Sequence, residues 1–179
     1  GVDPLSFNPF DVDANDAVAV ANALEVAKIS KQITTAISSF ASAAEGAGAD
    51  EGDAFTAALG SVVDVLKSKA EKIDDPSATA EEKEIDFTNA TDLALIKTEV
   101  SSKAAKLDGV DTTVITEEFF NDTTAAIKNV NDKIETVEDL DADSTKNIFS
   151  TMQVLKDQVK EAAKNNGTIA FKDSSAVND

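Results

Sequence analysis

Apolar residues that recur every three or four positions are the feature that most limits the fold of this 179-residue chain. Such spacing places side chains on one face of an α-helix, which has about 3.6 residues per turn. The two longest runs are Val26, Ile29, Ile33, Ile37, Phe40 and Ala44, and Thr116, Phe119, Thr123, Ile127, Val130, Ile134 and Val137. A helix with one apolar face needs partners, so the sequence predicts an all-α fold, an antiparallel bundle of four to five amphipathic helices.

Polar stretches that contain glycine or proline separate the expected helices. We expect the first helix over about residues 15–44, and "EGAGADEG" ends it. Asp50 or Asp53 can then cap a second helix, and Asn89 can cap a third, because their side-chain oxygens accept bonds from free N–H groups. These breaks predict short connections between neighbouring helices.

The ends of the chain differ from its middle. The pattern divides the chain into a lead-in segment (1–14), a helical bundle domain (15–167) and a C-terminal extended segment (168–179). The segments "EIDF" and "TIAF" both place Ile and Phe two positions apart, so we also consider that they pair as one minimal two-stranded ribbon.

Charge restricts the partners of this chain. It carries 34 acidic and 16 basic residues, for a formal net charge of −18, and every basic residue is a lysine. Such a surface repels phosphate groups, so we expect no nucleic acid as a partner and favour calcium or other cations. No run approaches the roughly 18 apolar residues of a membrane span, so no membrane insertion is expected.

The composition also restricts the chemistry. His, Cys, Trp and Tyr are absent, which removes thiolate nucleophiles, the usual zinc ligands and the commonest general base. We therefore expect that the protein is not an enzyme, although an enzyme built on carboxylates alone remains a minor alternative. Because the chain begins with Gly1 rather than Met, we also expect it to be a module of a larger protein.

Two acidic segments are the candidate metal sites. "DVDAND" places Asp11, Asp13 and Asn15 on alternate positions. Calcium prefers oxygen ligands of this kind, and alternate positions in a turning loop can direct three of them at one ion.

The second segment, "DLDADS", repeats the pattern with Asp139, Asp141 and Asp143, again directly before an expected helix. Neither segment has the glycine at position six or the glutamate at position twelve that an EF-hand loop requires. Two interpretations stay open: the carboxylates cap helix N-termini, or one or both segments also bind calcium.

A small group of lysines, Lys67, Lys69 and Lys72, lies beside acidic neighbours on the expected second helix. We interpret it as a solvated helix face rather than as a binding patch.

The opening stretch "SFNPFDVDANDAVAVANALEVAKISKQITTAISSF", followed by "AEGAG", resembles helical segments of very large secreted or surface-anchored bacterial proteins, particularly adhesins of marine bacteria. In those proteins such segments accompany calcium-dependent RTX or cadherin-like β-sandwich repeats. The resemblance covers mainly residues 4–50. It implies a secreted or cell-surface location, a multidomain parent and a non-catalytic role.

The leading hypothesis is therefore a non-catalytic structural or binding module of an extracellular bacterial adhesin or matrix protein that binds calcium, with cell-surface or matrix components as further partners. The alternative is a small-ligand-binding or sensor bundle, in which a gap between helices holds the ligand. Its sequence support is limited to Thr116 and Thr123, two polar residues in a helical apolar run.

Overall fold

The computed structural model describes residues 8, 12, 13, 15–139 and 141–177. All regular elements in these residues are helices, and none of these residues forms a strand. The elements are α1 (Ala17–Gly46), α2 (Glu51–Ala70), α3 (Ala80–Lys83), α4 (Ala90–Ala104), α5 (Glu117–Glu135), α6 (Ala142–Asn165) and two 3₁₀ turns, η1 (Ala170–Lys172) and η2 (Ser174–Val177). The all-α bundle predicted from the sequence is confirmed.

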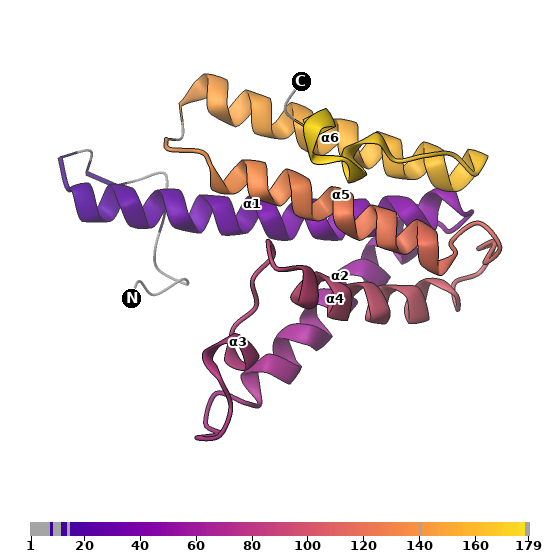
Figure 1. Cartoon of the computed structure of the whole chain (residues 1–179), viewed down its shortest axis with the longest axis horizontal. Helices are drawn as coiled ribbons and strands as arrows, with labels where there is room; N and C mark the ends of the chain where they lie inside the picture. The colour runs from indigo at the N-terminus through magenta and orange to yellow at the C-terminus, as the bar shows by residue number, and fades with distance from the viewer. Residues whose placement is uncertain (1–7, 9–11, 14, 140, 178–179) are drawn as a thin grey trace.

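The helices form two groups that differ in shape (Figure 1). Helices α1, α5 and α6 lie side by side as a three-helix unit, in which α5 runs opposite to α1 and α6. Helices α2 to α4, residues 51–104, form a second group, called the arm here, in which α4 lies along the unit while α2 leads away from it towards α3 at the far end. The arm joins the unit because α2 packs on α1 and α4 packs on α5.

The core lies mainly between the three long helices. Phe40 of α1 and Phe120 of α5 are fully buried, with ring centroids 6.4 Å apart. The sequence pattern placed Phe119 on the buried face of α5, but Phe120 occupies that position and Phe119 packs edge-on against it. Thr116, which the pattern also placed in the apolar stripe, is instead the N-cap of α5 and accepts a bond from the backbone N–H of Phe119.

Side-chain caps start the helices. Each of the six α-helices in the described residues has an N-cap side chain that accepts at least one backbone N–H bond: Asp16, Asp50, Thr79, Asn89, Thr116 and Asp141. The predicted cap at Asn89 is confirmed, and Asp50 rather than Asp53 caps α2. Asn166 ends α6 in the left-handed conformation, with φ 53°. Local sequence therefore set the helix boundaries well.

Two glycines bring the end of the arm against the end of the unit. Gly48, after α1, and Gly109, after α4, both have positive φ, at 110° and 80°. A Cβ atom on Gly48 would lie 2.4 Å from the carbonyl oxygen of Gly109, so only glycine permits this approach. The backbone N–H of Asp111 also donates to the carbonyl of Ala47 at 2.8 Å, which ties the two loops together.

The predicted ribbon is wrong, because the two segments satisfy their backbone groups elsewhere. The carbonyl of Phe87 accepts a bond from the Asn131 side chain, and the N–H of Phe171 donates to the Gln158 side chain. Phe87 and Ile169 are both buried, so both segments contribute to the core without pairing.

The C-terminal segment is also not extended where it is described. It forms η1 and η2, which pack on α5. The Asn129 side chain of α5 donates to the carbonyls of Phe171 and Lys172 at 3.0 and 2.9 Å, so polar contacts with α5 favour turns over an extended strand.

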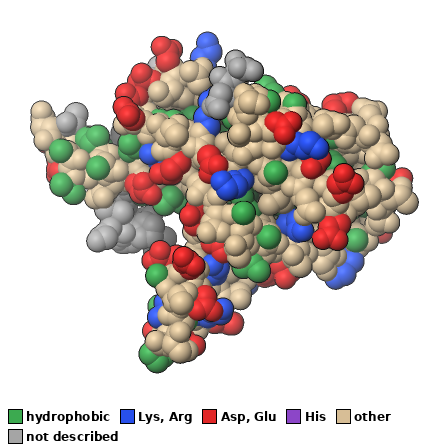
Figure 2. Space-filling model, viewed as in Figure 1, with side chains coloured by type: hydrophobic (Ala, Val, Ile, Leu, Met, Phe, Trp, Pro, Cys, Tyr) green, Lys and Arg blue, Asp and Glu red, His purple; other side chains and the backbone are tan. Residues whose placement is uncertain are grey.

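The surface is predominantly acidic. Carboxylates are spread over both the three-helix unit and the arm on the face that Figure 2 shows, with lysines among them. Hydrophobic side chains are exposed as well, notably at the start of α1, where Val18 is 70% exposed.

Candidate functional site

The first acidic segment binds its own backbone. The Asp13 carboxylate accepts bonds from both the backbone N–H and the side-chain amide of Asn15, each at 2.9 Å. The backbone bond, followed by the side-chain bond, lowers the pKa of Asp13. Asp16, which was not among the predicted ligands, caps α1 through Val18 and Ala19. Asp11, the remaining predicted ligand, lies outside the described residues.

The second acidic segment also caps a helix. Asp141 accepts the backbone N–H of Ser144 at 2.6 Å as the N-cap of α6, and this bond is the main cause of its lowered pKa. Asp139 accepts the N–H of Asp141 at 3.2 Å and the Ser144 hydroxyl at 3.4 Å. Asp143 is exposed in the first turn of α6, where its charge suits the helix dipole.

Helices α1 and α6 run in the same direction, so both begin at the same end of the three-helix unit (Figure 1). Within the described ranges, no group of three or more His, Cys, Asp or Glu side chains is arranged to hold a metal ion. Capping accounts for Asp141, while calcium binding at these segments stays a prediction.

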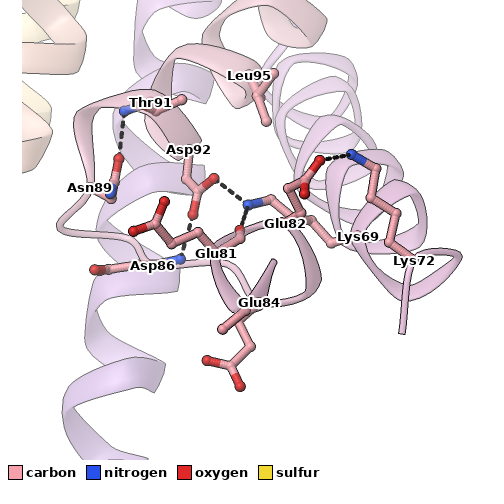
Figure 3. Close-up of a pocket in the computed structure, with 11 residues that line it drawn as sticks. Lys69, Lys72, Glu81, Glu82, Glu84, Asp86, Asn89, Thr91, Asp92 and Leu95 are labelled. Atoms are coloured by element: carbon pink, nitrogen blue, oxygen red, sulfur yellow. Dashed lines mark hydrogen bonds and ion pairs between the residues drawn. The ribbon is translucent and has the colours of Figure 1, made fainter. Parts of the chain in front are cut away.

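A cavity of about 450 Å³ in the arm collects more charged side chains than either acidic segment (Figure 3). It lies between α2, α3 and the start of α4. Its charged lining residues are Lys69, Lys72, Glu81, Glu82, Glu84, Asp86 and Asp92, with Leu95 on one side. Such a mixture can either bind a charged ligand or hold the elements together, and the hydrogen bonds decide between these roles.

The centre of this cavity is a buried ion pair. Lys69 Nζ lies 2.5 Å from Asp92 Oδ1, and the two side chains are 11% and 9% exposed. Lys69 also donates to the carbonyl of Glu81 in α3, and the other Asp92 oxygen accepts the N–H of Asp86 at 2.8 Å. The pair thus links α2, α3 and the start of α4 (Figure 3), which is a structural role.

Sequence reasoning missed this pair. Lys69 was expected on a solvated face, and that interpretation is wrong because Asp92 and Glu81 hold its ammonium group inside the arm. Lys72 remains half-exposed and pairs with Glu82 at 3.3 Å. The partners Lys69 and Asp92 are far apart in sequence, so no local pattern could reveal them.

Comparisons of the chain with protein-family models, with curated proteins and with solved structures find no match. None of the described helices is long and apolar enough to cross a membrane. The function proposed below therefore rests on the geometry of the site and on the charge distribution.

Proposed function

We propose that this chain is a non-catalytic structural or binding module of an extracellular bacterial adhesin or matrix protein, and that its acidic surface takes up calcium or other cations. The observation that supports this proposal most is the large excess of carboxylates over lysines, which gives a formal net charge of −18. Several lysines pair with carboxylates of other elements of the fold, and these pairs leave many acidic side chains of the described residues without a lysine partner.

Ion pairs between different elements show how the lysines are used. These pairs are Lys28–Glu135, Lys69–Asp92, Lys103–Asp64, Lys97–Glu117, Lys160–Glu45 and Lys172–Asp122. The carboxylate of Glu45 raises the pKa of Lys160, and that of Asp122 raises the pKa of Lys172, as expected for a bound ammonium group.

Excess negative charge on such a surface opposes folding by self-repulsion. With a formal charge of −18, the chain gains stability from any medium that screens or neutralises its carboxylates. Calcium-rich or salty surroundings, such as those outside a marine cell, provide both effects. A fold whose acidic residues far outnumber its lysines suits that environment.

A thermal melt tests the calcium part of the proposal. In 10 mM calcium, against chelator with sodium at the same ionic strength, we expect Tm to rise by about 3–10 °C, the range for a weak extracellular-type site. The variants Asp13→Asn and Asp139→Asn should lose this rise, because Asn retains an oxygen but not the charge. The variants Asp53→Asn and Asp74→Asn, elsewhere on the surface, provide the charge-matched control.

If calcium and sodium raised Tm equally at the same ionic strength, general charge screening would explain the rise, and the specific calcium sites would be rejected. The proposed location needs a separate test in the parent organism: an antibody against the module should label intact cells or the surrounding matrix.

The alternative of a small-ligand-binding bundle has weaker support. Within the three-helix unit, a cavity between α5 and α6, floored by Val130, Ile134 and Ile148, has a volume of only about 170 Å³. The cavity of about 450 Å³ in the arm is lined mainly by charged side chains, several of which pair with each other. Pockets that bury a typical small ligand measure about 300–1,000 Å³. The predicted polar pair does not provide a site either, because Thr116 caps α5 and the buried Thr123 hydroxyl donates to the carbonyl of Phe119.

A further inference from the structure

Helices α1 and α2 leave an apolar groove between them as they separate. The two helices pack closely near their connection, and α2 then leads away into the arm (Figure 1). The groove has a volume of about 590 Å³. Its apolar lining consists of Ile29 and Ile33 from α1, Leu66 from α2, and Ile85 and Phe87 from the segment before α4.

The floor of this groove is open to solvent. Ile29 is 41% exposed and Leu66 is 39% exposed, although both residues lie beside a core that buries Phe87 almost completely. Exposure of large aliphatic side chains on both walls leaves hydrophobic surface that another apolar group can cover. The groove is thus an incomplete packing site rather than an enclosed cavity.

Apolar surface continues from the groove along α2. Leu59 and Phe55 precede Leu66 by seven and eleven positions, so all three lie on one side of the helix, and they are 40%, 49% and 39% exposed. Phe55 lines a second cavity together with Ala41 and Glu45 of α1, so this side of α2 faces α1 at both ends. An elongated occupant fits such a track better than a compact ligand does.

The rim of the groove is acidic. Glu25, Glu84, Asp86 and Glu135 line it, and no lysine does, in the part of the chain that the structure describes. The other four cavities described all include lysine in their lining: Lys69 and Lys72 in two of them, Lys156 in another and Lys133 in the last.

The rim carboxylates differ in how free they are. Glu135 accepts a bond from the Gln32 amide at 3.0 Å and lies 3.7 Å from the Lys28 ammonium group. Asp86 accepts two bonds from Thr88. All four residues are exposed, but in the described part of the chain Glu25 and Glu84 have no such side-chain bond, so their charges are the most accessible to a cationic partner.

We infer that this α1–α2 groove, with its acidic rim and the apolar side of α2 beyond it, binds a basic amphipathic segment of a partner protein. Apolar side chains of the segment cover Ile29 and Leu66, and its lysines or arginines face Glu25 and Glu84. An apolar floor with an opposite charge along the edge is the chemistry by which grooves take up amphipathic helices. This inference rests on the proposed function as a binding module, for which it specifies the partner class.

A synthetic peptide tests the groove directly. The probe has fourteen residues, leucine on one helical face and lysine on the other, with one leucine replaced by tryptophan. Because the protein contains no tryptophan, the peptide provides the only indole fluorescence. Binding should shift this emission to the blue, and a peptide with glutamate in place of every lysine should not bind.

Matched variants locate the binding surface. Ile29→Ser and Leu66→Ser should each weaken binding about tenfold, because each removes an apolar contact of roughly side-chain size. Val154→Ser on α6, which alters a residue of similar exposure at 41%, should change it less than twofold.

Charge variants separate specific from general attraction. Glu25→Gln with Glu84→Gln should weaken binding and reduce its salt dependence, whereas Glu71→Gln with Glu99→Gln removes the same net charge elsewhere and should have little effect. If both pairs of substitutions weakened binding equally, net charge alone would explain the attraction, and the proposal would be overturned.

Two other outcomes would also overturn it. The first is absence of binding in a protein that still shows the calcium-dependent rise in Tm, which would reject the groove and leave the proposed function intact. The second is a dimer in sedimentation that Leu66→Ser dissociates, which would assign the groove to a second copy of the chain.

Discussion

The three-helix unit and the arm share one apolar core, but the arm also depends on a buried ion pair. In the unit, Phe40, Phe120, Ile127 and Leu155 are fully buried and form a nearly continuous apolar core. In the arm, α2 and α4 share a smaller apolar interface, and the buried Lys69–Asp92 pair completes the contact with α3.

This difference has a physical consequence for stability. Burial of apolar surface depends little on pH or salt, whereas a buried ion pair stabilises only while both partners remain charged and bonded. Both regions leave large apolar side chains exposed, such as Phe55 and Leu66 in the arm and Val18 and Phe149 in the unit, so the ion pair is what distinguishes the arm. We therefore expect the arm to open at a lower free energy than the unit.

The largest expected effect tests the core of the unit. Phe120→Ala should lower the free energy of unfolding by about 4 kcal/mol, because it removes a fully buried aromatic ring that packs against Phe40 and leaves a cavity. Phe55→Ala, at a ring that is 49% exposed in the arm, is the control and should cost less than about 1 kcal/mol. Urea denaturation measures both, and equal losses would contradict the assigned position of the core.

A somewhat smaller effect tests the buried pair of the arm. Asp92→Ala should cost about 3 kcal/mol, because it leaves the Lys69 ammonium group buried without its carboxylate. Hydrogen exchange should show the loss of protection concentrated in α2 to α4, with α5 and α6 retaining theirs.

The double variant Lys69→Met with Asp92→Leu provides the control for this pair. It replaces both charges by apolar groups of similar length, so it should recover most of the stability that the single variant loses. A double variant as unstable as Asp92→Ala, or protection lost evenly along the chain, would contradict the account of the arm.

The fold could be predicted from the sequence to the extent that it depends on local signals. Caps such as Asn89 act within a few residues, and the structure places this cap as expected. The choice between Phe119 and Phe120 could not be made in this way, because it depends on which side of α5 meets α1.

The candidate sites were less accessible to sequence reasoning for the same reason. The arrangement of Asp13 and Asp141 is local, and the capping interpretation anticipated the bond that Asp141 accepts from the backbone N–H of Ser144. The Lys69–Asp92 pair and the α1–α2 groove each join residues that are distant in the sequence. Charge counts predicted an acidic surface, but only the three-dimensional fold shows which lysines pair with carboxylates of other elements.

The smallest effect concerns the pH dependence of the three-helix unit. The pKa of Asp141 lies below its ordinary value of 3.8, chiefly because its carboxylate accepts the N–H of Ser144. A lowered pKa in the folded state means that the ionised cap stabilises the protein above about pH 4 and that this contribution is lost as the pH falls through the folded value.

The variant Asp141→Asn tests this contribution, because it keeps an oxygen acceptor but removes the charge. The wild type should be slightly more stable than the variant at pH 7, by less than either effect above, and the stabilities of the two proteins should converge below about pH 4. Urea midpoints at pH 7, 5 and 3 measure the difference. A difference that stays constant with pH would mean that the shape of this cap, and not its charge, stabilises α6, and the unit would then depend on electrostatics even less than its apolar core suggests.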